Sequence, residues 1–296
     1  MQFLVYILVY PFIWLISILP FRLLYALSDG LYIIIYKIVG YRKKVVQDNL
    51  RLVFPEKPET EIKDITKKFY HHFCDMMVEG VKSLTISEAD LKKRFTFSNI
   101  EVLHQLEAEK RSIILMCGHY GNWEWIFVLQ KYITYKGYGV YSRLGNKYFD
   151  ALVKNIRARY NSTLITTKQT VPTLVRAKIN GELTMNVLVS DQSPMVSRAI
   201  HWNEFMGIKV PIHTGAELLA KRLNMPVVFF KVRRLKRGYY ETTFEVLALE
   251  PKQYPNFEIS DRFMMKVEKQ IYSAPEFYLW THRRWKHRDK VPEKFQ

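Results

Sequence analysis

The chain has 296 residues, with 45 Lys and Arg against 28 Asp and Glu, which gives a formal net charge of +17. An apolar share of 48% excludes a disordered chain, and 12 glycines with 12 prolines exclude a collagen-like or linker-dominated sequence. The length fits one α/β domain of roughly 250 residues with an appendage. Two cysteines, Cys74 and Cys117, are too few for a disulfide framework and lie in no metal-ligand spacing, which favours a reducing compartment.

Residues 1–22 are predicted to form a transmembrane anchor. The run 3–19 has no charged side chain and is long enough to cross about 30 Å of hydrocarbon as a helix, even with Pro11 inside it. It lacks the basic start and the small-residue cleavage site of a secretory signal peptide. Basic residues follow at Arg22 and 42–44 and are expected to stay cytoplasmic, which would leave the N-terminus outside.

Residues 23–92 are predicted to be interfacial and linking helices. The short apolar run 31–36 favours an interfacial or core helix, with a re-entrant hairpin as the alternative. Residues 40–92 are polar and helical in period, with a break at 54–58.

Residues 93–296 alternate short β-branched runs with helical periods, which is typical of an α/β sheet covered by helices on both faces. The predicted strands are 95–97, 112–116, 139–141, 163–165, 183–189, 226–232 and 240–247. The predicted helices are 100–109, 123–131, 148–160, 171–179, 214–222 and 259–273, followed by a basic C-terminal helix. We therefore expect a central, mostly parallel sheet flanked by helices.

Basic residues cluster at 231–237 and 282–290. Such charge suits nucleic acid, anionic lipid or an acidic protein. No nucleic-acid motif is visible, and an anchor on the same chain favours headgroup phosphates. We therefore expect a membrane partner and no nucleic acid.

The run 118–125, GHYGNWEW, follows an apolar strand. His119 therefore stands at the carboxyl end of a strand, where catalytic groups collect in open α/β sheets. Glu124, in the first turn of the next helix, is placed to hydrogen-bond one ring nitrogen and leave the other as a general base. Gly121 and Asn122 are candidates to stabilise an oxyanion through backbone N–H groups, and Asn122 also to cap the helix. The alternative is that His119 only caps or packs.

Other chemistries fit the motif poorly. Cys117, His119 and Glu124 do not make a metal site, because successive strand residues point to opposite faces. No Gly-x-Ser-x-Gly elbow, nucleotide loop or dinucleotide fingerprint is visible. We therefore expect no metal and no nucleotide cofactor.

The block His119-x4-Glu124 resembles the motif of the lipid A late acyltransferases, the lauroyl- and myristoyltransferases within the glycerolipid acyltransferase superfamily. Further blocks similar to that family cover roughly residues 40–288 in the family's order. These blocks are Asn49-Leu50, Phe54-Pro55, Tyr141-Ser-Arg143 with Asn146, Ser190-Asp191-Gln192, Thr214-Gly215-Ala216 with Leu219-Ala220, and Ala274-Pro275-Glu276 through Arg284.

The resemblance implies transfer of a fatty acyl chain from an acyl carrier protein thioester to a hydroxyl of an anionic lipid A precursor. It assigns the general base to His119 and the orienting acid to Glu124, with no acyl-enzyme and no cofactor. It also implies the bacterial inner membrane, with the catalytic domain on the cytoplasmic face.

Four further residues match family positions. Arg143 would bind a phosphate or the oxyanion, and Asp191 would contact the acceptor or brace the site. Arg283 and Arg284 would reach phosphates. The plain alternatives are a surface arginine at 143, ordinary turn chemistry at 191, and solvated arginines on a packed C-terminal helix.

Two other functions remain open at this stage. One is a related acyltransferase that acts on a lysophospholipid, aminolipid or other glycolipid. Glu124 as the acid, and a Phe54-Pro55-Glu56 block that precedes the histidine, favour lipid A instead. The other is a non-catalytic membrane-anchored lipid-binding protein, against which the intact His119 and Glu124 argue.

Overall fold

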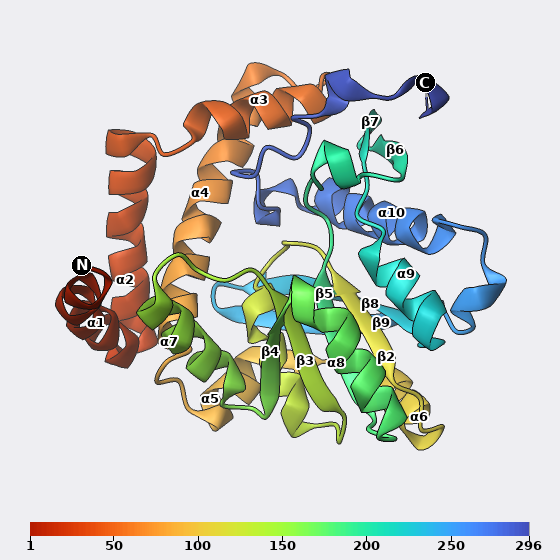
Figure 1. Cartoon of the computed structure of the whole chain (residues 1–296). Helices are drawn as coiled ribbons and strands as arrows, with labels where there is room; N and C mark the ends of the chain where they lie inside the picture. The colour runs from red at the N-terminus through yellow and green to blue at the C-terminus, as the bar shows by residue number, and fades with distance from the viewer. Residues whose placement is uncertain (296) are drawn as a thin grey trace.

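A computed structural model describes residues 1–295 (Figure 1). The chain begins with helices only, and the break predicted at 54–58 lies between two of them, as expected. These elements are α1 (Gln2–Ile18), α2 (Phe21–Tyr32), the π-helix η1 (Ile33–Val39), α3 (Lys43–Val53), α4 (Glu59–Lys82) and α5 (Glu88–Arg94).

A seven-stranded sheet forms the centre of the rest of the chain, in the order β1-β9-β8-β2-β5-β3-β4. Its strands are β1 (Phe95–Phe97), β2 (Ile113–Cys117), β3 (Lys136–Tyr141), β4 (Ser162–Thr166), β5 (Thr184–Val189), β8 (Val227–Lys236) and β9 (Tyr239–Ala248). Strands β2, β3, β4, β5 and β8 run parallel, whereas β9 is antiparallel to β8 and β1 is parallel to β9. The predicted mostly parallel α/β sheet is confirmed.

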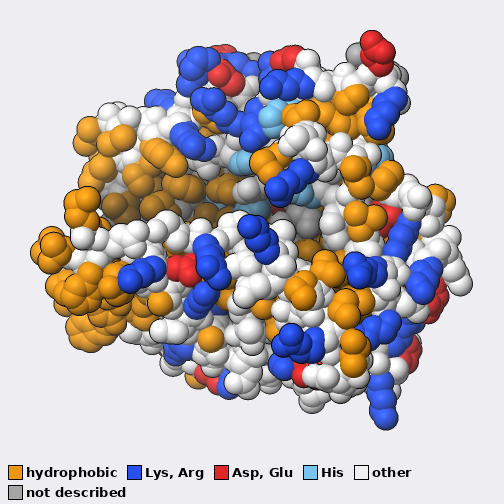
Figure 2. All heavy atoms as spheres, in the orientation of Figure 1, with side chains coloured by type: hydrophobic (Ala, Val, Ile, Leu, Met, Phe, Trp, Pro, Cys, Tyr) orange, Lys and Arg blue, Asp and Glu red, His pale blue; other side chains and the backbone are white. Residues whose placement is uncertain are grey.

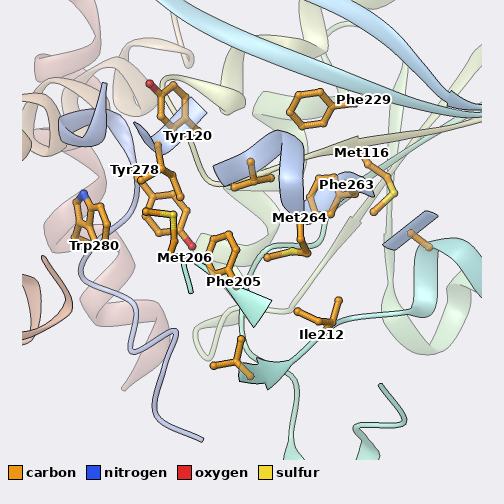
Figure 3. Close-up of a cluster of buried hydrophobic side chains, with 14 of the residues drawn as sticks. Met116, Tyr120, Phe205, Met206, Ile212, Phe229, Phe263, Met264, Tyr278 and Trp280 are labelled. Atoms are coloured by element: carbon orange, nitrogen blue, oxygen red, sulfur yellow. The ribbon is translucent and has the colours of Figure 1, made fainter. Parts of the chain in front are cut away.

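Helices cover both faces because the central strands are apolar on both sides. In the fully buried β2, Ile114 and Met116 join the core under α8 (Thr167–Ile179), α9 (Gly215–Leu223) and α10 (Glu258–Ser273). Ile113 and Leu115 point the other way, toward α5, α6 (Glu101–Ala108) and the 3₁₀ helix η2 (Trp123–Lys131). Figure 3 shows the first core, where side chains from β2 and β8 meet those of α10.

Two segments differ from the prediction. A hairpin of β6 (Trp202–Phe205) and β7 (Ile208–Pro211) was not expected, because its turn, Met206-Gly207, is not a common turn pair; both residues take positive φ. The predicted basic C-terminal helix is wrong. After α10, the described chain forms short 3₁₀ helices, turns and one β-bridge from Tyr278 to Tyr120, and its Trp280 and Trp285 side chains are fully buried in the core.

Helix α1 packs against α4 and α7 (Lys147–Ala158). Among residues 1–295, no single helix has both the length and the apolar composition to cross a bilayer. The segment Phe21–Val39 meets those criteria only together with α3, across a bend of 87°. The transmembrane anchor at 1–22 thus stays a prediction.

Candidate active site

The turn after β2 presents His119 at the carboxyl end of the parallel strands. Gly121 takes a φ of +60°, and a Cβ there would lie 3.0 Å from Val232. Only glycine fits this turn without strain. The C-terminal segment holds the turn in place through two backbone hydrogen bonds. The Gly121 N–H donates to the Phe277 carbonyl at 2.9 Å, and the Leu279 N–H donates to the His119 carbonyl at 3.1 Å.

Asp191, just after β5, is the hydrogen-bond partner of His119. Its Oδ1 lies 2.6 Å from His119 Nδ1, and its Oδ2 accepts the backbone N–H of His119 at 3.0 Å. The carboxylate is buried, whereas the imidazole is 18% exposed. Since β2 and β5 are neighbours in the sheet, their carboxyl ends bring these two residues together.

The environment of Asp191 fixes the histidine's tautomer. Burial alone would raise the pKa of Asp191, but the charge and hydrogen bonds of His119 hold that pKa below its ordinary value. An ionised carboxylate only accepts, so His119 donates from Nδ1 and carries its lone pair on Nε2. The amide of Gln192 lies 3.2 Å from that Nε2. His119 is therefore arranged as a base, with Nδ1 held by Asp191 and Nε2 pointing away from Asp191, toward the amide of Gln192.

Glu124 does not hydrogen-bond His119, so that part of the sequence prediction is wrong. Its carboxylate forms a bidentate ion pair with the guanidinium of Arg157 of α7, with N–O distances of 2.6, 2.7 and 3.0 Å. Sequence spacing suggested a local partner for His119, but the sheet supplies one 72 residues away. Arg157 was not predicted, because a lone arginine near the end of a helix carries no signal of its partner.

A cavity of about 580 Å³ opens beside His119. The carboxyl ends of β2, β3 and β5 contribute to its wall, together with Gln192 and His213. Burial lowers the pKa of His213, so this residue faces the cavity uncharged at neutral pH. The volume and the mixed lining are those of a small-molecule site.

A second cavity of about 460 Å³ adjoins the first and is almost wholly apolar. Its walls come from α4, α7 and Ile13 of α1. Trp123, Phe127 and the Glu124–Arg157 pair line both cavities, so this pair stands between the polar and the apolar space. Figure 2 shows the hollow, with hydrophobic side chains on its walls and histidine side chains at its inner end.

One of the two proposed oxyanion donors, the Gly121 N–H, is already engaged, and the side chain of the other residue, Asn122, has structural partners. The Gly121 N–H is bonded to Phe277, so it is not available to a substrate, and that expectation is wrong. Asn122 is buried: its Oδ1 caps η2 by accepting the N–H of Trp125, as predicted, while its Nδ2 donates to Glu79 of α4 at 2.8 Å.

The three predicted arginines lie in different environments. Arg143 is exposed on the loop between β3 and α7, beside Ser142 and Leu144, which line the first cavity. Arg283 is exposed. Arg284 is fully buried with its guanidinium over the ring of Phe205 at 5.0 Å, so it is not a solvated arginine.

The sequence assigned no role to His282, which lies in the family-like block 274–284, yet the structure places it near the site. Its Nε2 accepts the backbone N–H of Ser193 at 3.2 Å, and burial lowers the pKa of His282 to about 4. A neutral, accepting histidine holds the loop that follows Asp191 in place. Among residues 1–295, no three His, Cys, Asp or Glu side chains converge as metal ligands.

Comparison with known proteins identifies the family of this chain. The family model of bacterial lipid A biosynthesis acyltransferases matches residues 1–287. The chain is 27% identical to the lipid A biosynthesis lauroyltransferase of Escherichia coli K12, over 96% of this chain and 92% of that protein. It is 26% identical to a lipid A biosynthesis acyltransferase of Haemophilus influenzae, over 93% and 88%. It is 20% identical to the palmitoleoyltransferase of E. coli K12, over 93% and 89%. The chain therefore belongs to the bacterial lipid A biosynthesis acyltransferases and is an O-acyltransferase.

Proposed function

We propose that this protein is a membrane-bound enzyme that moves a fatty acyl chain from an acyl carrier protein thioester to a hydroxyl of a lipid A precursor, with His119 as the general base. The observation that carries the proposal is the arrangement of His119. One ring nitrogen is held by Asp191, and the residue lines a cavity that shares part of its wall with an apolar one.

The proposed reaction needs no covalent enzyme intermediate. The Nε2 of His119 takes the proton of the acceptor hydroxyl while the hydroxyl oxygen attacks the thioester carbon. The tetrahedral intermediate collapses, the carbon–sulfur bond breaks, and the leaving thiolate takes the proton back from the imidazolium. The ionised Asp191 stabilises the imidazolium formed on the way. Thioester and ester are close in energy, so positioning contributes most of the catalysis.

The apolar cavity suits the acyl chain. Glu124 and Arg157 form part of its wall, and most of the rest comes from hydrophobic side chains of α1, α4, α7 and η2. A chain whose carbonyl lies beside His119 would leave its thioester in the polar cavity and extend into the apolar one. Two relatives named above are a lauroyltransferase and a palmitoleoyltransferase, names that specify long acyl chains.

The charge of the molecule suits both substrates. The net charge is +17, and Figure 2 shows Lys and Arg side chains along the rim of the hollow. The lipid A precursor carries phosphates, and acyl carrier proteins are acidic, so both would be attracted to this face. Arg143 and Arg283, both exposed, are available to bind phosphates. The exposed apolar residues of α1 favour attachment to the inner membrane, with the catalytic domain on its cytoplasmic face.

The test is transfer of label from radiolabelled acyl carrier protein to a tetra-acylated lipid A precursor, with detergent-solubilised wild type beside His119→Ala. We expect label in the lipid with the wild type and a loss of at least a hundredfold with the variant. Circular dichroism of both proteins controls for folding.

Two outcomes would contradict the proposal in different ways. Transfer only to a lysophospholipid or aminolipid would keep the chemistry and replace the acceptor. Equal transfer by wild type and His119→Ala would remove the proposed base, and no transfer to any acceptor would favour a lipid-binding protein.

A further inference from the structure

Helix α1 carries a continuous apolar stripe that no other part of residues 1–295 covers. Leu4, Leu8, Phe12 and Leu15 lie at helical spacing along one side, and their exposed fractions are 63, 69, 67 and 51%. Figure 2 shows hydrophobic side chains gathered over this helix. A patch of this kind on a protein surface marks an interaction site.

Both ends of α1 are tied to the folded domain by polar contacts. At the start, Gln2 bonds the loop before α7: its Nε2 donates to the Gly145 carbonyl at 3.1 Å, and its own carbonyl accepts from Asn146 at 3.0 Å. At the end, Lys82 of α4 donates to the carbonyls of Ser17 and Leu19 at 2.7 and 2.9 Å. A helix bound at both ends to one soluble domain does not place those ends on opposite sides of a bilayer.

Helix α2 is tied down in the same way. Tyr25 donates to Glu79 at 2.8 Å, and Ser28 donates to Asp75 at 2.7 Å. Asp29 is paired with Arg237 of the β8–β9 turn at 2.6 Å. These contacts fix the inner side of α2, while exposed apolar side chains occupy its outer side and that of η1. They are Leu23, Ile33, Ile34, Ile38 and Val39.

We propose that α1 and the α2–η1 segment lie in the plane of one leaflet of an anionic phospholipid membrane instead of crossing it. The inference rests on the proposed membrane attachment and replaces the orientation expected from the sequence: both ends of α1 are on the side of the catalytic domain. A 17-residue helix is about 25 Å long, at the lower end of the roughly 17 to 25 residues that a span takes, so length alone does not decide between the two arrangements and the contacts at both ends do.

Geometry and charge favour a lipid surface as the occupant. In Figure 1, α1 is seen nearly along its axis while α2 runs up the same edge of the molecule, so one plane can contain both helices. Exposed cations flank the apolar residues at Arg22, Lys37, Arg42 and Lys44, where anionic headgroups would meet them. Ile13 of α1 lines the apolar cavity, so this helix is both a cavity wall and a lipid contact.

The test is the depth of probes along α1 in the full-length protein. Both native cysteines are buried, so single cysteines introduced by Leu4→Cys, Leu8→Cys, Phe12→Cys and Leu15→Cys take a fluorescent label selectively. The labelled proteins are bound to phosphatidylethanolamine vesicles containing phosphatidylglycerol, and quenching by lipids brominated at different depths is measured. Ile179→Cys, at an equally apolar and exposed position on α8, is the matched control.

We expect one shallow depth, within about 10 Å of the headgroups, for all four probes on α1 and no quenching at position 179. A depth that is greatest at Leu8 and Phe12 would show a crossing helix and overturn the inference, and so would vesicle binding without quenching on α1. Failure to co-sediment with vesicles would instead remove the membrane attachment itself. The acyl transfer assay in detergent scores the proposed reaction independently of all three results.

Discussion

At the scale of single residues, the proposed catalytic arrangement depends on a long-range pair. His119 and Asp191 are 72 residues apart, and the carboxylate binds both the ring and the backbone N–H of the histidine. Asp191 thus fixes where the ring sits as well as which nitrogen bears the proton. Asp191 is therefore a positioning residue, and its removal should affect the rate of the chemical step more than substrate binding.

We expect Asp191→Asn to lower kcat by about a hundredfold to ten-thousandfold with little change in KM, because an amide permits the wrong tautomer. The matched control is Asp261→Asn, which breaks another His–carboxylate contact, from Asp261 to His201 at 2.7 Å. Steady-state kinetics with a labelled acyl carrier protein measures both. Equal losses in the two variants would indicate a general structural effect and contradict the role of Asp191.

At the scale of elements, α4 is the helix that joins the N-terminal part to the sheet. Its buried Glu79 accepts hydrogen bonds from Tyr25 of α2, Asn122 before η2 and Tyr240 of β9. Three elements are therefore fastened to one carboxylate. The next residue, Gly80, lines the apolar cavity, so α4 contributes both to the packing around Glu79 and to the cavity wall.

Glu79 predicts a pH-dependent stability. Burial raises the pKa of Glu79 to about 7, from an ordinary value of 4.5. The folded state therefore binds the Glu79 proton more tightly than the unfolded state does. The contribution of this group to the free energy of unfolding is fully present below about pH 4.5 and is lost as the pH rises through 7. Glu79→Gln should abolish this dependence and be more stable above pH 7, by on the order of 3 kcal/mol. Urea unfolding at several pH values measures it; an unchanged pH dependence in the variant would contradict it.

Gly80 predicts a change in chain-length preference. A Cβ at this position meets no atom within 4 Å and Gly80 lines the cavity, so we expect the side chain of Gly80→Leu to enter the cavity. We expect kcat/KM for the longest chain that the wild type accepts to fall at least about tenfold relative to shorter chains. Competition between carriers of different chain length measures the ratio. Gly30→Leu, on α2 and equally open, is the control; if both variants keep the wild-type preference, the chain does not occupy this cavity.

The elements were more predictable than the site. Strands such as 113–117 and 184–189 are predictable because they consist mostly of β-branched and apolar residues, a pattern that reflects burial on both faces of the sheet. His119 was predictable because it follows such a strand. Its partner Asp191, and the pairing of Glu124 with Arg157, depend on which strands and helices become neighbours, and local sequence does not encode that order. The turn at Met206-Gly207 was missed for a local reason, since methionine rarely takes positive φ.

At the scale of the whole molecule, the net charge of +17 predicts a strong dependence on salt. The Debye length falls from about 10 Å at 0.1 M salt to about 3 Å at 1 M, so attraction of an acidic carrier weakens. We expect kcat/KM with acyl carrier protein to fall at least about tenfold between about 0.05 and 0.5 M salt. A neutral acyl-pantetheine donor is the control and should change little. Parallel losses for both donors would show that salt acts on the enzyme or the acceptor instead.

The hydrogen bonds between the C-terminal segment and the turn that carries His119 also have a consequence for synthesis of the protein on the ribosome. Gly121 and His119 are bonded to Phe277 and Leu279, which follow them far along the chain. A chain that leaves the ribosome N-terminus first therefore acquires the helices proposed to face lipid before it can complete the turn that carries His119. In the proposed arrangement, the nascent enzyme binds the membrane before its active site is complete. A chain terminated before Phe277 would bind the membrane but would lack activity.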